Sequence, residues 1–226
     1  MTASPSRLEY AYAFDLAASW LERAGGPYLA VVSTPEFVDL IASRVTGNVI
    51  FACDDERTLD HAARRVAAST YSDDEGETGR VWPAVETVAQ PETFGSVFWA
   101  APQHGSWEVK LAAIGRLVAP AGEVCLFTGT SVSAFLRPLR ARQEAGGPAP
   151  LAGRVHAGLA ASGWQVIRSR RLGGIASAGW AVTGRLAALA GRPDLADRAE
   201  RAHHIAVESE RGASYALLCA VLGGIQ

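Results

Sequence analysis

The stretch that decides the fold is Gly95–Thr128, GSVFWAAPQHGSWEVKLAAIGRLVAPAGEVCLFT. Its first segment, Gly95–Ala101, is a short apolar run typical of a strand buried on both faces. Trp107–Val118 then has helical periodicity, and Glu123–Thr128 is a second apolar run. A strand, a helix and a strand in this order predict a crossover unit whose two strands lie parallel in one sheet. The expected apolar face of the helix consists of Val109, Leu111, Ile114, Leu117 and Val118.

The same alternation continues on both sides of this stretch. The further predicted strands are Tyr28–Ser33, Asn48–Cys53, a weaker Arg80–Val88, Trp164–Ser169 and Tyr215–Leu222. The further predicted helices are Ser6–Arg23, Pro35–Val45, Asp55–Ala68, Ala134–Arg142, Leu151–Ser162, Ala176–Ala190 and Asp194–Val207. Parallel sheets bind ligands at the carboxyl ends of their strands, near the switch in strand order. We therefore expect a site in the loops after Val32, Cys53, Ala101 and Thr128.

Composition and charge narrow the classes of function. The 226 residues suit one domain spanning 1–226, and 49% hydrophobic residues provide ample material for a core. The formal net charge of −2 lacks the basic surplus of nucleic-acid-binding proteins, and no apolar run reaches the roughly 20 residues of a membrane helix. The three cysteines are widely separated and lie in apolar runs, which indicates buried thiols in a cytoplasmic protein, with no disulfide framework and no metal site.

The stretch Gly95–Thr128 and two later segments carry a resemblance to a known family. In Arg116–Gly122 (RLVAPAG), the proline cannot continue the helix and the glycine permits the turn into the next strand. Leu159–Leu172 reads as a late helix, a small turn and a strand, and Ser214–Leu222 reads as a final strand. Together these segments resemble the class I S-adenosylmethionine-dependent methyltransferases.

This resemblance implies an α/β fold with a Rossmann-like, seven-stranded, mostly parallel sheet and helices on both faces. The last strand would insert antiparallel between strands five and six. Residues 1–26 would form an N-terminal helix, and residues 174–210 would form a helical insertion that serves as a lid over the substrate. The resemblance also implies S-adenosylmethionine as cofactor and a small molecule as methyl acceptor.

The turn after strand one departs from the family pattern. In the family, this strand ends in an acid and a glycine-rich turn, which lets the backbone approach the cofactor closely. The matching stretch here, Leu29–Phe37 (LAVVSTPEF), has no glycine, and Ala30 stands in the place of the acid. Ser33 and Thr34 are the cofactor-binding candidates of this turn, although side chains here should crowd the cofactor. Thr34 also suits the N-cap of a helix beginning at Pro35.

The cofactor candidates after strands two and three are Asp54, Asp55 and Trp82. The family has an acid at the end of strand two that accepts both ribose hydroxyls, but Cys53 matches that position. Asp54 or Asp55 would reach the ribose if the loop shifts; alternatively, both only cap the following helix. After strand three the family often has an acid near the adenine amine, where this chain has Trp82 and then Glu86. Trp82 would either stack on adenine or pack in the core.

His104 is the catalytic candidate. It follows strand four in a loop that meets the methyl acceptor in the family, and a histidine there can act as a general base because its pKa lies near working pH. The alternative is a surface or structural residue. His203 and His204 should point about 100° apart on a helix, so they would not readily share a metal ion, and surface positions are expected for both. Either a phosphate-binding cluster or a solvated strand end explains Arg168, Arg170 and Arg171.

Three functions remain open. The first is a divergent methyltransferase acting on a small molecule, since methyl transfer depends chiefly on positioning. The second is a non-catalytic homologue that serves as a partner or regulatory subunit, which the missing glycines favour. It predicts an exposed apolar patch, either on the first helix or on the helices between Ala176 and Val207. The third is an enzyme of another class, a cyclase or isomerase, on the same scaffold. The expected partners are a small-molecule acceptor, another protein or a second copy in a homodimer, and neither nucleic acid nor membrane.

Overall fold

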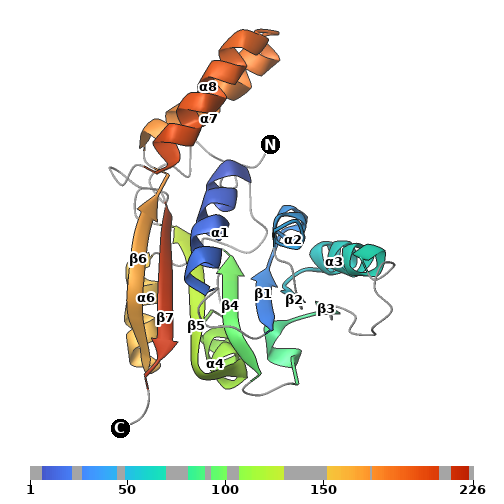
Figure 1. The fold of residues 1–226 in the computed structure, drawn as a ribbon, viewed down its shortest axis with the longest axis vertical. Helices are drawn as coiled ribbons and strands as arrows, with labels where there is room; N and C mark the ends of the chain where they lie inside the picture. The colour runs from blue at the N-terminus through green and yellow to red at the C-terminus, as the bar shows by residue number, and fades with distance from the viewer. Residues whose placement is uncertain are drawn as a thin grey trace.

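The computed structural model describes residues 7–21, 27–44, 49–69, 81–89, 93–100, 107–129, 152–173, 175–208 and 215–223. Seven strands form one sheet in the order β3-β2-β1-β4-β5-β7-β6 (Figure 1). β7 runs antiparallel to its two neighbours, and every other pairing is parallel. The predicted mostly parallel sheet with an antiparallel last strand is therefore confirmed. The strands are β1 Tyr28–Val32, β2 Val49–Cys53, β3 Val81–Trp82, β4 Phe94–Ala100, β5 Val118–Gly129, β6 Trp164–Leu172 and β7 Tyr215–Leu222.

Three helices cover one face of the sheet. They are α1 (Arg7–Leu21), α2 (Pro35–Ala42) and α3 (Glu56–Ser69), and Figure 1 shows them on the same side. Phe14 of α1 meets Phe98 of β4 edge-on, with ring centroids 5.1 Å apart, and Phe37 of α2 packs against the same ring. All three rings are buried, so this aromatic group joins two helices to the centre of the sheet.

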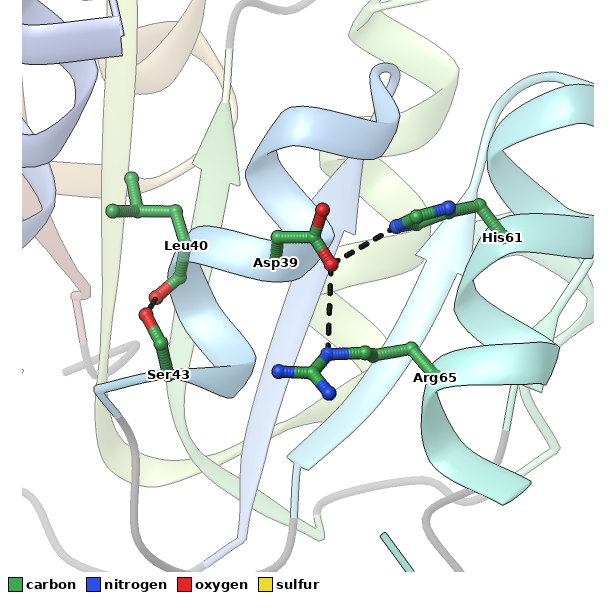
Figure 2. Close-up of polar contacts among 5 residues, drawn as sticks. All are labelled: Asp39, Leu40, Ser43, His61 and Arg65. Carbon is green, nitrogen blue, oxygen red and sulfur yellow. Dashed lines mark hydrogen bonds and ion pairs between the residues drawn. The ribbon is translucent and has the colours of Figure 1, made fainter. Parts of the chain in front are cut away.

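A polar bridge ties α2 to α3 on the solvent side. Asp39 Oδ1 lies 3.0 Å from His61 Nε2 and 3.5 Å from Arg65 Nε (Figure 2). His61 and Arg65 are four residues apart, so they share one face of α3. Because all three side chains are partly exposed, the bridge fixes the relative position of the helices more than it stabilises the fold.

The opposite face is covered by α4 (Trp107–Leu117), α6 (Ala152–Ala161) and a single 3₁₀ turn, η2 (Val85–Thr87). Val109 was predicted on the apolar face of α4 but is 60% exposed, so that prediction is wrong for this residue. The buried face of α4 is rotated from the predicted one, because it begins at Trp107 and not at Val109. Four residues at helical spacing are buried on it: Trp107, Leu111, Ile114 and Leu117.

The predicted helical insertion is a hairpin of α7 (Ile175–Leu189) and α8 (Pro193–Val207). The hairpin projects beyond the carboxyl end of the sheet (Figure 1), where α8 packs against α1. A Cβ at Gly184 would lie 3.5 Å from Ala199 Cβ, so the two helices pack closely through small residues. Large apolar side chains nevertheless remain exposed on both helices: Trp180, Val182, Leu186, Leu189, Leu195 and Ile205. An exposed apolar patch was expected here for a partner subunit.

Three predicted strands differ from their observed bounds by more than one residue, and one of them, β6, continues past the predicted end at Ser169 to Leu172. Arg80–Val88 is not one strand: β3 contains only two residues, and Pro83 leads away into η2 because proline has no N–H to donate to a sheet. β5 begins at Val118 instead of Glu123, with an irregularity at Ala121, whose φ is 65°. A Cβ at Gly122 would lie 2.6 Å from Val118 Cγ1, so close approach within the strand requires this glycine. The predicted helix Ala134–Arg142 lies outside the described residues.

Candidate functional site

The carboxyl ends of β1 and β2 lie beside the switch in strand order. β1 is the strand from which the sheet extends to β2 and β3 on one side and to β4 and β5 on the other. Asp54 follows β2 directly, and its N–H donates to the carbonyl of Val32 at 3.1 Å. Asp54 therefore lies against the end of β1, where Ser33 and Thr34 begin the next turn. These residues and the first turns of α4 outline the candidate site.

Cys53 and Asp54 point to opposite faces of the sheet, as neighbouring residues on a strand do. The Cys53 thiol is buried in the core with residues of α2 and α3. Burial raises the pKa of this thiol to about 12, and the negative charges of Asp55 and Asp54 contribute to the rise. Cys53, which the resemblance aligns with the family's ribose-binding acid, is thus an inert core residue. Asp54 is the acid on the other face, toward α4.

Lys110 of α4 pairs with Asp54 through Nζ and Oδ1. The two side chains are only 12% and 10% exposed, respectively. Burial raises the pKa of Asp54, the hydrogen bond and charge of Lys110 oppose that rise, and the charges of Glu86 and Asp55 add to it. Sequence reasoning assigned no role to Lys110. The one available signal was that it is the only lysine in the chain.

Asp55 has a different role from Asp54. Its Oδ1 accepts a hydrogen bond of 2.9 Å from the N–H of Thr58, in the first turn of α3. This is the geometry of an N-cap carboxylate, and the side chain faces solvent. Of the two alternatives for this acidic pair, capping applies to Asp55, whereas Asp54 turns inward.

The turn after β1 carries the side chains of Ser33 and Thr34 and contains no glycine. Thr34 has the extended conformation of an N-cap, and its carbonyl accepts from the N–H of Phe37 at 3.2 Å. Its hydroxyl makes no capping hydrogen bond. Ser33 and Thr34 are both partly buried, and Pro35 starts α2 without an N–H to offer. The structure thus keeps the expected strand, turn and helix but not the glycine-lined approach.

Two polar side chains near Asp54 have unmatched buried atoms. Trp82 ends β3, pairs in register with Ala52 and packs its ring against the core cluster under α4. Its Nε1 is buried and has no hydrogen-bond partner among the described residues. Glu86 Oε2, in η2, is likewise buried and unmatched within the described part of the chain. Glu86 is also close enough for its charge to raise the pKa of Asp54.

Of the remaining candidates, His104 lies outside the described residues. His203 was expected at the surface, but it is buried, because it lies one helical turn from the buried Ala199 and one from Val207; His204 is exposed as expected. Arg168 pairs at 3.7 Å with the buried Glu123 of β5, which also accepts a hydrogen bond from the Cys219 thiol. The arginines of β6 therefore include one ion-paired residue on the sheet, far along the strand order from Asp54.

Comparisons with solved structures show which fold this is. The chain is similar to the [4+2]-cyclase SpnF (TM-score 0.64, 16% identity, 94% of this chain and 81% of that one). It is similar to an S-adenosylmethionine-dependent methyltransferase from Aquifex aeolicus (TM-score 0.55, 13% identity, 97% and 94%). It also resembles geranyl diphosphate C-methyltransferase from Streptomyces coelicolor (TM-score 0.57, 10% identity, 92% and 79%). The fold is that of the class I methyltransferases.

The methyltransferase fold is shared here without close sequence relationship. No family model matches the chain, and no curated protein matches it. The solved geranyl diphosphate C-methyltransferase contains Mg²⁺, geranyl diphosphate and S-adenosylhomocysteine. Among the residues described here, no group of three acidic, histidine or cysteine side chains is arranged to hold a metal ion. Nor does any helix within the described ranges combine the length and apolarity needed to span a bilayer.

Proposed function

We propose that the protein is a divergent methyltransferase that binds S-adenosylmethionine at the carboxyl ends of β1, β2 and β3 and methylates a small molecule. One observation carries this proposal. Hydrogen-bonding groups of Asp54, Glu86 and Trp82 are buried at this one edge of the sheet, and two of them have unmatched atoms within the described residues. Buried polar atoms in proteins are nearly always paired, so unmatched ones at the carboxyl ends of parallel strands, where such sheets bind ligands, favour a ligand.

The adenosyl end of the cofactor fits these residues. The carboxylate of Asp54 can accept from ribose hydroxyls, since its lone pairs exceed what Lys110 uses. Oε2 of Glu86 can accept from an exocyclic amine such as that of adenine, and it follows β3, where the family often has such an acid. Trp82 offers an indole face and an Nε1 donor that has no partner within the described part of the chain.

The methionine end fits less closely, because Ser33 and Thr34 carry side chains at the turn. When bound, S-adenosylmethionine supplies a methyl group on a sulfonium that is already a good leaving group. The chain's contribution is then to orient the cofactor, to hold the acceptor in line and to exclude water. His104 remains the candidate that would take a proton from a hydroxyl acceptor.

The direct test is calorimetric titration with S-adenosylmethionine and S-adenosylhomocysteine, together with thermal unfolding. At a hundred times its dissociation constant, a ligand stabilises the native state by about 2.7 kcal/mol. In a chain of this size that corresponds to a rise in Tm of roughly 5–10 °C. The absence of both a measurable heat and a melting shift would contradict the proposal.

The substitution Glu86→Gln makes the test specific for the adenine amine. The wild type should prefer S-adenosylhomocysteine over S-inosylhomocysteine, which has a carbonyl oxygen in place of the amine. A charged acceptor typically contributes about tenfold or more in affinity. In Glu86→Gln this preference should fall, because an amide can also donate to the carbonyl. Equal discrimination in both proteins would remove Glu86 from the site.

The exposed apolar hairpin favours a second candidate, a non-catalytic partner subunit. Leu189 of α7 is 77% exposed and Ile205 of α8 is 79% exposed. A group of large apolar side chains this exposed is typical of a surface that binds a partner. Under this function, the cofactor would produce no heat, and replacing Val182, Leu186 and Leu189 by serine would abolish association with a protein partner. The similarity to SpnF keeps a cyclase within the range of this scaffold, since a fold does not fix a reaction.

A further inference from the structure

Burial of the ion pair between Lys110 and Asp54 costs desolvation free energy, and stabilisation of the fold does not by itself account for it. Lysine is rarely buried, because removing an ammonium from water is unfavourable unless a partner compensates. Lys110 lies in the first turns of α4, whereas Asp54 follows β2, so the contact spans from a helix to the carboxyl edge of the sheet. A hydrophobic pair of similar volume would often stabilise a fold equally well.

The position of Asp54 in the chain explains what the lysine adds. The acid stands one residue later than the family's ribose-binding acid, whose place Cys53 occupies. Cys53 faces the core under α2 and α3, and the strand alternation turns Asp54 to the α4 side. Lys110 meets the carboxylate on that side. The displaced acid is thus held by a residue from another element.

The charges around Asp54 would otherwise favour its protonation. Burial raises the pKa of Asp54, and the negative charges of Glu86 and Asp55 raise it further. Lys110 is the cation that opposes these effects, through its hydrogen bond and its charge. A protonated carboxyl has one acceptor oxygen fewer for a pair of ligand hydroxyls.

We propose that Lys110 is a positioning residue, which keeps Asp54 oriented as a two-oxygen acceptor for the vicinal hydroxyls of the ribose of an adenosyl ligand. This inference rests on the proposed function, because it assigns a role to Lys110 in the same site. It names the feature of the ligand that Lys110 serves, the 2′,3′-diol. A role that is only structural would affect every ligand of the site alike.

The experiment compares S-adenosylhomocysteine with its 2′-deoxy analogue by calorimetric titration of the wild type, Lys110→Met and Lys110→Gln. The wild type should bind the diol about tenfold or more tightly than the deoxy compound. Both variants should lose most of that preference while still binding the deoxy compound. Arg116→Met is the matched control, since Arg116 is the exposed arginine in the last turn of α4, and it should leave both affinities unchanged.

A pH series supplies a readout that a structural role would not move. In the wild type, the preference for the diol should disappear as pH falls and Asp54 becomes protonated. In Lys110→Gln, the midpoint of that loss should move to higher pH, because the opposing cation is gone. Lys110→Gln keeps a polar hydrogen-bond donor on a side chain one bond shorter, so it remains informative if Lys110→Met does not fold.

The remaining outcomes all decide the question. Equal weakening of both ligands, or tighter binding of S-adenosylhomocysteine by the variants, would overturn the positioning role and leave the proposed function intact. A wild type that binds both compounds equally would likewise show that Asp54 does not read the diol. A wild type that binds neither would overturn the proposed function and this inference together.

Discussion

Gly158 of α6 lies directly against the ring of Trp107 on α4: a Cβ at position 158 would be 2.0 Å from Cη2 of that ring. Trp107 is buried, so its ring has little room to move. We expect Gly158→Ala to lower the free energy of unfolding by about 1–3 kcal/mol, as overpacked cores do.

Gly153, on the same helix, has nothing within 4 Å of its Cβ position. Gly153→Ala should therefore raise stability by roughly 0.5–1 kcal/mol through helix propensity alone. Urea unfolding of both variants provides the measurement, and destabilisation by both would contradict this account.

The three cysteines should be unreactive in the native protein. Cys53, Cys125 and Cys219 are all buried free thiols, and burial raises the pKa of Cys53 to about 12. At pH 8 that pKa leaves about one thiolate in ten thousand, and the thiolate is the reacting species. Ellman's reagent should label none of the three rapidly before denaturation and all three in guanidinium chloride. Rapid labelling of one thiol in native buffer would indicate local opening of the sheet.

Asp54 should make stability depend on pH in a recognisable direction. Burial raises the pKa of Asp54 in the folded protein above the ordinary 3.8. At pH values between 3.8 and the folded pKa, the native state therefore binds more protons than the unfolded state. The contribution of Asp54 to stability is therefore fully present below about pH 3.8 and is lost as pH rises through the folded pKa. The difference in unfolding free energy between the wild type and Asp54→Asn should shrink over this range and then level off. A difference that grows with pH would show that the Lys110 ion pair outweighs burial.

The bridge between α2 and α3 should contribute little by itself. Asp39→Ala removes both contacts, to His61 and to Arg65, from partly exposed positions. We expect a loss of about 0.2–1 kcal/mol, which decreases at high salt. A double-mutant cycle of Asp39→Ala with Arg65→Ala isolates the ion pair. A coupling energy above about 2 kcal/mol would mean that the bridge is more rigid and less hydrated than its exposure suggests.

Much of the sheet could be predicted because its strands are apolar runs between residues that break structure. Tyr215–Leu222 has the predicted bounds, and β4 differs from its prediction by one residue at each end. The strand alternation also orders neighbouring side chains. Ala52, Cys53 and Asp54 fall alternately on the two faces, so the inward turn of Asp54 toward α4 was implicit in the pattern once the strand was known.

The pairing that matters most at the site could not be predicted in the same way. Asp54 and Lys110 are distant in sequence, and their contact depends on how far α4 is rotated about its axis. That rotation was misjudged, because Val109 was counted among the buried residues in place of Trp107. The unmatched atoms at the site, Trp82 Nε1 and Glu86 Oε2, also needed coordinates, as did those elsewhere in the described residues, Thr58 Oγ1 and Trp99 Nε1. The local sequence pattern does not show whether a polar atom has a partner.

The place of β7 in the sheet has a consequence for folding during translation. β7 lies between β5 and β6, yet it is translated after both. Until it emerges, β5 presents an open, apolar edge and β6 has no neighbour to hydrogen-bond. The nascent chain must keep these pieces apart for many codons, which invites chaperone binding during translation. A premature stop before Tyr215 would thus yield an aggregation-prone fragment in which β5 and β6 are not joined in one sheet. Such a fragment would be degraded and would not form a shortened domain.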